Sequence, residues 1–277
     1  MLPPPTSRTW YKSPISRVFE TKASAGRLVT GDVAARFRAA RGDPSLVVLE
    51  GFHAVKHALR FGAELVEVVA VDPAVAAELA ERLAPDVRDQ LVRQARTVDA
   101  DTFAALGSAP PPTGVAAVAR RPAVDLAGLL SAPGPGPVVL LDAPRHLGNV
   151  GAAIRVAAAA GAEAVAVHGD ADPWHPAAVR GAAGLQFALP VGRLESLAGL
   201  RRPLVALDPE GEPLRPERVP EGAVLAFGSE RRGLSPELGQ AAAARVSLPM
   251  RAGVSSLNLA TAVAATLYIC VHSHRPA

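Results

Sequence analysis

The chain has 277 residues, 49% of them hydrophobic, a formal net charge of +3 and one cysteine. A single cysteine excludes a disulfide framework and a thiolate metal site, and it is typical of a reducing cytoplasm. Residues 1–13 lack the apolar core of a signal peptide, and the longest apolar run, residues 259–271, is too short to span a bilayer. We therefore expect a soluble, cytoplasmic protein with room for two domains and no membrane segment.

The positive charge is concentrated toward the N-terminus. Residues 1–60 hold ten Lys or Arg against four Asp or Glu, whereas residues 61–120 hold five against nine. A local excess of cations is typical of proteins that bind a polyanion, and it is also compatible with an ordinary solvated surface.

The first part of the chain is expected to form an arm followed by a small domain. Residues 1–22 have no sustained periodicity and predict an extended arm. Residues 23–120 predict a small α/β domain, because strand-like and helix-like stretches alternate. The expected strands are 45–49, 66–71 and 113–119, and the expected helices are 52–61 and 74–84. Residues 121–137 contain the stretch SAPGPGP and predict a linker.

Residues 138–277 predict a larger α/β domain. Near-continuous apolar runs separated by helical stretches indicate a parallel sheet that is covered on both faces. The expected strands are 138–141, 164–167, 204–207, 224–227 and 246–248. The final helix, about residues 257–272, is apolar on nearly every side, so we expect it to be buried, in part by a second subunit.

Three of these strands open into loops that hold glycine and polar side chains. The loops are residues 142–149, 228–233 and 251–256. Ligands of open α/β sheets bind at the carboxyl ends of the strands, so the three loops predict one shared site.

Two side chains of the alanine-rich helix after the first loop are notable. Asn149 is a good candidate for the N-cap of this helix. Arg155 is the only charge in residues 151–160, and a buried guanidinium needs a partner. We therefore expect Arg155 to be paired or to face a cleft, with Glu230 as the candidate partner.

Polar side chains also precede the final helix. Ser255, Ser256 and Asn258 follow the last strand. They are suited to cap the helix or to orient a hydroxyl or amide, and the sequence leaves both roles open.

Several common sites lack their motifs here. The segment GNVGAA superficially resembles a dinucleotide-binding turn, but G-x-G-x-x-G is absent, and residues 142–146 lie where a tight turn is needed. The sequence contains no HExxH or Cys/His pattern, no G-x-S-x-G turn and no phosphate loop. We expect neither a nicotinamide or flavin site nor a metal site.

Together, the three segments resemble the signature motifs of the SpoU (TrmH-type) RNA ribose 2′-O-methyltransferases of the SPOUT class. The matches are Asn149-x-Gly151-x-x-x-Arg155, Phe227-Gly228-x-Glu230-x-x-Gly233-Leu234, and Pro249-Met250 followed by Ser256-Leu257-Asn258. Residues from about 20 to 120, including VVLEGFHAVKHAL, resemble the L30e-like RNA-binding domain of many members.

The resemblance implies a fold, a cofactor and a partner. The larger domain is expected to thread a trefoil knot, a rare exception to unknotted chains, to bind S-adenosyl-L-methionine in that knot, and to pair as a homodimer. The residues expected to contact the cofactor are Leu207, Gly228, Leu248, Met250 and Leu257. The expected catalytic residues are Asn149, Arg155, Glu230, Ser256 and Asn258.

The resemblance also implies how RNA is handled. Arg155 is expected to bind the target phosphate and to stabilise negative charge that develops on the ribose oxygen. Arginine stays protonated in proteins, so the proton acceptor is left open. The residues expected to bind RNA, on the first helix of the small domain and just before it, are Arg36, Arg38, Arg41, Lys56 and Arg60.

The implied activity is transfer of a methyl group from S-adenosyl-L-methionine to a ribose 2′-hydroxyl. We favour 23S ribosomal RNA, because L30e-like domains bind folded RNA, with tRNA as the alternative substrate. A housekeeping role and an antibiotic-resistance role both stay open. The hypothesis from another class is a non-enzymatic RNA-binding factor, which the intact set of expected catalytic residues disfavours.

Overall fold

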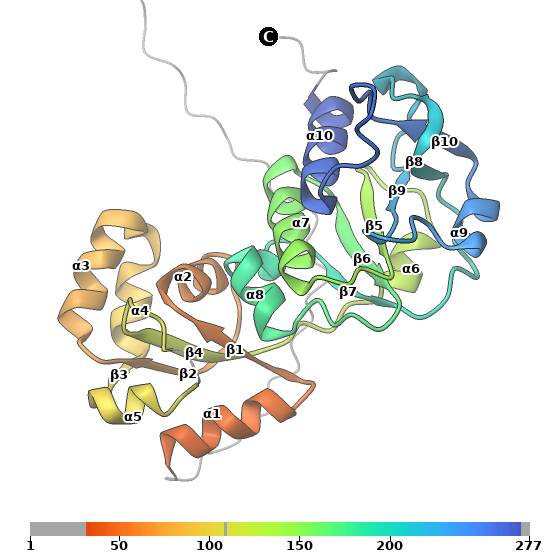
Figure 1. The fold of residues 1–277 in the computed structure, drawn as a ribbon. Coiled ribbons are helices and arrows are strands. Elements are labelled where there is room, and N and C mark those ends of the chain that lie inside the picture. The colour runs from red at the N-terminus through yellow and green to blue at the C-terminus, as the bar shows by residue number, and fades with distance from the viewer. Residues whose placement is uncertain (1–31, 108–109, 273–277) are drawn as a thin grey trace, which may run out of the picture.

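The computed structural model describes residues 32–107 and 110–272, so the expected arm, residues 1–22, lies outside the described part. The described residues form a smaller α/β unit followed by a larger one (Figure 1). Within this part of the chain, no helix has the length and apolar character needed to cross a membrane.

The smaller unit is built on a mixed sheet with the strand order β1-β4-β2-β3. Strand β4 runs antiparallel to β1 and β2, and β3 runs parallel to β2. The strands are β1 (Leu46–Glu50), β2 (Leu65–Ala70), β3 (Ala95–Thr97) and β4 (Val115–Arg120). The helices are α1 (Val33–Gly42), α2 (Phe52–Arg60), α3 (Pro73–Leu83), η2 (Pro85–Val87), α4 (Arg88–Gln94) and α5 (Ala100–Ala104). The strands and helices expected in this unit are confirmed, with small shifts at their ends.

Helix α1 is absent from the elements that the sequence predicted. Asp32 caps it, because its carboxylate accepts a hydrogen bond from the backbone N–H of Ala34 at 2.9 Å. Phe37 and its small neighbours are buried against one face of the sheet. The buried face of the helix is narrow and its residues alternate with basic ones. The sequence therefore showed no clear apolar periodicity, and the helix was not predicted. Arg36, Arg38 and Arg41 therefore lie on a helix of their own, not just before the first helix.

The larger unit is a six-stranded sheet of the order β10-β8-β9-β5-β6-β7 in which all neighbours are parallel (Figure 1). The strands are β5 (Val138–Asp142), β6 (Ala164–His168), β7 (Val191–Leu194), β8 (Leu204–Pro213), β9 (Val224–Phe227) and β10 (Ala244–Ser247). The helices are α6 (Leu126–Leu130), α7 (Leu147–Ala160), α8 (Pro176–Ala182), η3 (Leu185–Phe187), η4 (Pro216–Arg218), α9 (Pro236–Ala241) and α10 (Leu259–His272). The five expected strands and the parallel α/β class are confirmed, and β7 is an additional strand.

Helices cover both faces of this sheet, as expected. In β5, Val139 and Leu141 pack in the core cluster that contains α7 and α10, whereas Val138 and Leu140 pack in the cluster that contains α6 and α9. Helix α6 lies inside residues 121–137, the segment predicted as a linker, and buries its leucines against the larger sheet.

Helix α10 is buried on one face only. Leu259, Val263 and Leu267 pack inward, where the helix contacts α7. On the outer side, Tyr268 keeps 49% of its surface exposed. The expected burial is confirmed for the inner face, while most of the other residues of the helix are partly buried or exposed.

The two units are joined through α8, which contacts β1 and α2. His57 of α2 lies with Nδ1 2.7 Å from the carbonyl oxygen of Ala183, at the end of α8. Arg121 and Asp172 form an ion pair of 3.1 Å beside this contact. One apolar core cluster runs through both units, so α2 is held at a fixed place beside the larger sheet.

Candidate functional site

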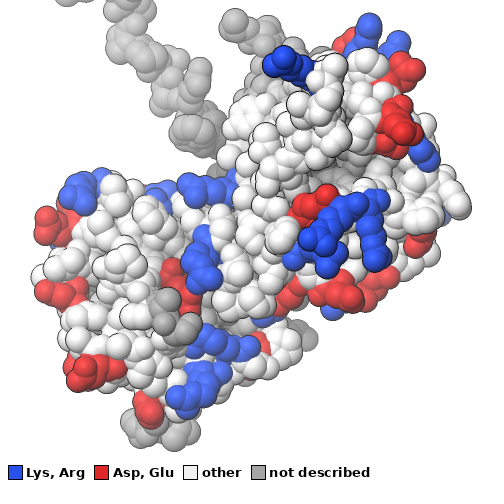
Figure 2. All heavy atoms as spheres, in the orientation of Figure 1, with Lys and Arg blue, Asp and Glu red and all other residues white. Residues whose placement is uncertain are grey.

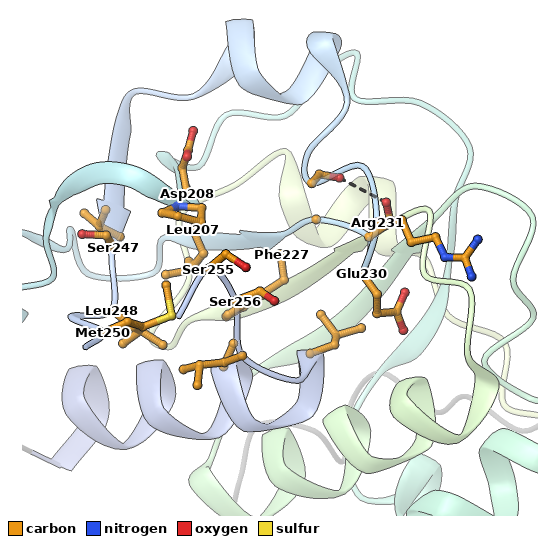
Figure 3. Close-up of a pocket in the computed structure, with 18 residues that line it drawn as sticks. Leu207, Asp208, Phe227, Glu230, Arg231, Ser247, Leu248, Met250, Ser255 and Ser256 are labelled. Atoms are coloured by element: carbon orange, nitrogen blue, oxygen red, sulfur yellow. Dashed lines mark hydrogen bonds between the residues drawn. The ribbon is translucent and has the colours of Figure 1, made fainter. Parts of the chain in front are cut away.

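A pocket with a volume of about 360 Å³ opens beside the middle of β8 and at the carboxyl ends of β9 and β10 (Figure 3). This volume is in the range of small-molecule sites, and the walls are mainly apolar with a few polar groups. The five residues expected to contact a cofactor all line it: Leu207, Gly228, Leu248, Met250 and Leu257. Glu230 and Ser256 of the expected catalytic set line it as well.

The loop after β9 folds back on itself to form one wall of the pocket. The backbone N–H of Ser229 donates to the carbonyl of Gly233 at 2.9 Å, and the reverse hydrogen bond is 3.1 Å. Gly233 has a φ of +66°, which favours glycine. A Cβ on Gly228 would collide with the backbone of Gly233 and Leu234. Both glycines of the motif are therefore needed for the turn itself.

The loop after β10 forms the opposite wall and leads into α10. Asn258 caps this helix, because its Oδ1 accepts hydrogen bonds from the backbone N–H groups of Ala260 at 3.0 Å and Thr261 at 3.4 Å. Ser255 and Ser256 line the pocket (Figure 3). Of the two roles left open by the sequence, capping is taken by Asn258, and the serine hydroxyls border the cavity.

A chain of hydrogen bonds joins the three loops at the edge of the pocket. Asn258 Nδ2 donates to Asn149 Oδ1 at 3.1 Å, and Asn149 Nδ2 donates to Glu230 Oε1 at 2.9 Å. The backbone N–H of Arg145 donates to Glu230 Oε2 at 3.2 Å. Burial opposes the ionised form of Glu230, but these hydrogen bonds outweigh it and lower the pKa of its carboxyl. Three of the expected catalytic residues are thus connected.

Asn149 is not the N-cap of α7, in contrast to the expectation. The helix begins two residues earlier, at Leu147, and the capping position is His146, whose side chain makes no capping hydrogen bond. The side-chain amide of Asn149 instead accepts a hydrogen bond from Asn258 and donates one to Glu230. The capping preference of asparagine predicted the wrong local role because long-range partners satisfy its side chain.

Arg155 stands apart from this network. Glu230, its candidate partner, bonds to Asn149 instead, and Arg155 is exposed and makes no ion pair with the described residues. It lies six residues beyond Asn149 on α7, roughly 9 Å along the helix axis. Its positive charge contributes to lowering the pKa of His53 and Lys56, on α2, after the larger effect of burial. Arg155 thus faces the junction of the two units.

A buried carboxylate, missed in the sequence, holds the loop after β9 in place. Asp142, the last residue of β5, is 2% exposed. Its Oδ2 accepts a hydrogen bond of 2.6 Å from the backbone N–H of Ser235, and its Oδ1 lies 3.0 Å from His168 Nδ1. The signal in the sequence was an acidic residue closing an apolar strand, a position that faces the carboxyl edge of the sheet.

Asp208 and Arg231 also line the pocket and were not predicted to do so (Figure 3). Asp208 follows the apolar start of β8 at the carboxyl edge of the sheet, as Asp142 does in β5. Arg231 directly follows Glu230 in the loop after β9. Both are polar residues next to predicted site residues, and only the course of the backbone shows that they border the cavity.

Most of the arginines expected to bind RNA are engaged by carboxylates. Arg36 forms a forked contact with Glu67, and Arg60 forms one with Asp86. Arg41 pairs with Glu50 at 3.0 Å. Arg38 and Lys56 make no ion pair among the described residues.

Metal binding has no support in the described part of the chain, where no group of three His, Cys, Asp or Glu side chains is arranged to hold an ion.

The fold and pocket first define a class. The wholly parallel α/β sheet, which has a pocket at its carboxyl edge bordered by glycine- and serine-bearing loops, matches the fold of a solved SpoU methyltransferase, a member of the SPOUT class. Residues 136–268 match the SpoU rRNA Methylase family. These residues therefore form a SpoU-type methylase domain.

Known relatives agree with this assignment. The 23S rRNA (uridine(2479)-2′-O)-methyltransferase of Streptomyces viridochromogenes is 35% identical over 147 residues, which is 48% of this chain and 51% of that protein. The 23S rRNA (guanosine(2553)-2′-O)-methyltransferase RlmP of Bacillus subtilis is 28% identical over 230 residues, covering 80% and 86% of the two chains. The alignment thus spans about half the length of the first relative and most of the second.

A solved structure extends the similarity to both units. The SpoU methyltransferase AviRb from Streptomyces viridochromogenes, in complex with AdoMet, superimposes with a TM-score of 0.69 and 27% identity. The superposition covers 87% of this chain and 97% of that one.

Proposed function

We propose that this protein transfers a methyl group from S-adenosyl-L-methionine to a ribose 2′-hydroxyl of RNA, with 23S ribosomal RNA as the substrate. The observation that carries the proposal is that two of the three motif loops line one pocket. The third is tied to them through Asn149, which bonds to Glu230 and Asn258. The names of the curated relatives and of the AdoMet-bound neighbour support it. Transfer RNA is the second candidate substrate.

The pocket has the chemistry that S-adenosyl-L-methionine requires. Leu207, Leu248 and Met250 offer apolar and polarisable surface for an adenine ring. The carboxylates of Asp208 and Glu230 border the cavity and complement the positive charge of a sulfonium. When bound, this cofactor supplies a methyl group on that sulfonium. The residues present therefore fit the cofactor.

The chain's own contribution is mainly positioning. The hydrogen bonds among Asn258, Asn149 and Glu230 fix the ends of three loops around the place where the ribose must enter. Correct placement of two reactants contributes about 7–11 kcal/mol to lowering a barrier in favourable cases. Glu230 is a weak proton acceptor, because its pKa lies below the usual value, so its main role is to hold Asn149.

We extend the proposal to a homodimer formed through the outer face of α10. This face leaves Tyr268 exposed, and the adjoining loop leaves Val254 and Leu257 exposed at 49% and 42%. Helix α7 lies beside α10, so a second copy on this face would approach the site. A dimer offers an explanation for the distance between Arg155 and the pocket of its own chain.

Mixing two inactive variants tests this explanation. Arg155→Ala and Asn149→Ala would each be purified and combined under conditions that exchange subunits. Recovery of methyl transfer would show that Arg155 serves the pocket of the other subunit. No recovery, with dimers present, would mean that Arg155 acts on RNA bound at its own chain.

The activity itself is tested with RNA from a strain that lacks the gene. The protein is incubated with radiolabelled S-adenosyl-L-methionine and either rRNA or tRNA, and the RNA is digested to nucleosides. Label on a 2′-O-methyl nucleoside from one RNA class is the expected result and identifies the substrate. Absence of cofactor binding would refute the enzyme and favour a non-enzymatic RNA-binding factor.

The family assignment carries further proposals. We propose a trefoil knot in the larger domain, an L30e-like RNA-binding role for residues 23–120, and a cytoplasmic location. Domain boundaries near residues 23 and 121 belong to the same proposal, and helix α6 of the segment predicted as a linker is counted with the larger domain.

A further inference from the structure

Three arginines lie close to Glu230 at one edge of the pocket, and we call them the mouth arginines: Arg145, Arg231 and Arg232. Arg145 lies in the loop after β5, and the other two lie in the loop after β9. All three are exposed. Figure 2 shows Lys and Arg side chains gathered over this part of the larger unit.

The side chains of the mouth arginines have no bonding partner in the described part of the chain. Among the described residues, none of them makes an ion pair or a side-chain hydrogen bond. Glu230, the carboxylate next to them, is already bonded through Oε1 to Asn149 and through Oε2 to the backbone N–H of Arg145. It therefore stabilises the loops without neutralising a guanidinium.

The backbone that carries these side chains is held firmly. The Ser229–Gly233 turn is closed by two backbone hydrogen bonds, and the N–H of Arg232 donates to Ser229 Oγ at 3.3 Å. The buried Asp142 fixes the end of the loop through Ser235. In Figure 3, the guanidinium of Arg231 points away from the cavity, toward the outside. A fixed backbone presents unpaired guanidinium groups outward, so a ligand gains their charge without first breaking an ion pair.

We propose that Arg145, Arg231 and Arg232 bind the phosphates that flank the target ribose in the RNA substrate. The inference rests on the proposed function, since a ribose presented to this pocket brings a phosphodiester on each side. Guanidinium groups match phosphate oxygens with forked hydrogen bonds, and such contacts fix the register of a nucleic acid without reading its bases. The mouth arginines position the ribose, and the hydrogen-bonded side chains behind them surround it.

The rival ligand is the carboxylate of the cofactor, because Arg231 also lines the pocket. A variant must therefore be examined for the two ligands separately. The decisive variant is R145Q/R231Q/R232Q. Its matched control is R82Q/R93Q/R96Q, which removes three exposed arginines that also make no ion pair, on the far side of the smaller unit.

Binding to 23S rRNA transcribed in vitro would be measured across a series of salt concentrations, and binding of S-adenosyl-L-methionine by calorimetry. For the mouth variant we expect RNA affinity to fall by about tenfold or more near 0.1 M salt, and the salt slope to flatten by about one unit for each lost phosphate contact. Cofactor affinity should stay within about twofold of the wild type, a change of about 0.4 kcal/mol. The KM for RNA should rise with the RNA dissociation constant.

Two results would overturn the inference. An equal loss of RNA affinity in the control would mean that total charge is responsible, and a loss of cofactor affinity with normal RNA binding would assign the arginines to the cofactor. RNA binding is measured without catalysis, so a failure of the proposed methyl transfer can be told apart from a failure of the proposed RNA-binding surface. A wild type that binds RNA through these arginines but transfers no methyl group would refute the activity and leave the surface standing.

Discussion

The two groups of arginines in this chain differ in what their charge is used for. In the smaller unit, Arg36, Arg41 and Arg60 are engaged by carboxylates of the same unit. At the mouth of the pocket, Arg145 and the two arginines that follow Glu230 pair with no carboxylate of the described residues. The N-terminal excess of positive charge first suggested a polyanion partner. Part of that charge instead forms ion pairs within the smaller unit.

A count of cations along the sequence therefore does not locate a binding surface. An arginine that already pairs with a carboxylate must exchange that partner for a phosphate, so its net gain is small. An exposed arginine on a fixed loop loses only water and side-chain freedom. Pairing is decided in three dimensions, whereas the count is made along the sequence.

Replacement of Arg155 is expected to have the largest effect on activity. Arg155 belongs to neither group of arginines and lies on α7, facing α2. Arg155→Ala should lower kcat by at least about 100-fold, because a guanidinium that stabilises developing charge is lost. Cofactor affinity, measured by calorimetry, should stay nearly unchanged because Arg155 does not line the pocket. A variant with normal turnover would remove Arg155 from the catalytic set.

Gly228→Ala should come next, because it disrupts the turn that presents two of the mouth arginines. The new Cβ would collide with the backbone of Gly233 and Leu234, so the loop must open. We expect both cofactor and RNA affinity to fall by about tenfold or more, a loss of at least about 1.4 kcal/mol for each ligand. Gly42→Ala is the control, since a Cβ there meets nothing within 4 Å. Similar affinities in both variants would contradict the packing argument.

Arg36→Gln should show the opposite pattern to the mouth arginines, with lower stability and little change in RNA binding. It leaves the carboxylate of Glu67, whose side chain is 6% exposed, without its forked partner. The free energy of unfolding in urea should fall by about 1–3 kcal/mol. Arg38→Gln, on the same helix and exposed, should change it by less than about 0.5 kcal/mol. If R36Q instead weakened RNA binding as much as the mouth variant, the comparison between the two groups would fail.

The smallest effect is expected from pH at the contact between the two units. Burial lowers the pKa of His57, and nearby Lys56 and Arg60 add to the effect, while the carbonyl of Ala183 opposes it. As the pH falls through 6.5, the unfolded chain therefore binds more protons than the folded one, and the free energy of unfolding decreases. The slope from one histidine is at most about 1.4 kcal/mol per pH unit.

The His57→Gln variant checks this pH effect by urea unfolding at several pH values between 5 and about 7.5, the range over which histidine titrates. Its slope should be shallower than that of the wild type but not zero, because the pKa of His53 is lowered too. An unchanged slope would show that His57 does not contribute.

The sequence predicted more of the larger unit than of the smaller one. Buried parallel strands are short apolar runs that stand out from their surroundings, so all five expected strands of residues 138–277 were found. Helix α1 was missed because its buried face is a narrow stripe among arginines. Strand β7 was missed because its four residues include a glycine and an arginine.

The sequence predicted which residues line the site better than it predicted which side chains bond to one another. The resemblance to the SpoU methyltransferases identified Leu207, Gly228 and Met250, which line the pocket. The predicted hydrogen-bond partners of Asn149 and Glu230 were wrong. A local capping rule was applied to Asn149 and charge pairing to Glu230, whereas the actual partners lie about 80 or more residues away in the chain.

The parallel α/β class and the loops that carry the site could be predicted from the sequence, since strand burial and glycine turns leave local patterns. Which polar groups contact one another depends on the folded chain. Asp142 bonds to Ser235 across 93 residues, and Asn258 bonds to Asn149 across 109. Arg36 pairs with Glu67, whereas the mouth arginines pair with no carboxylate in residues 32–107 and 110–272. Hydrogen bonds and ion pairs act over a few ångströms between residues far apart in the chain, so they depend on how the strands are ordered in the sheet and leave no periodic trace.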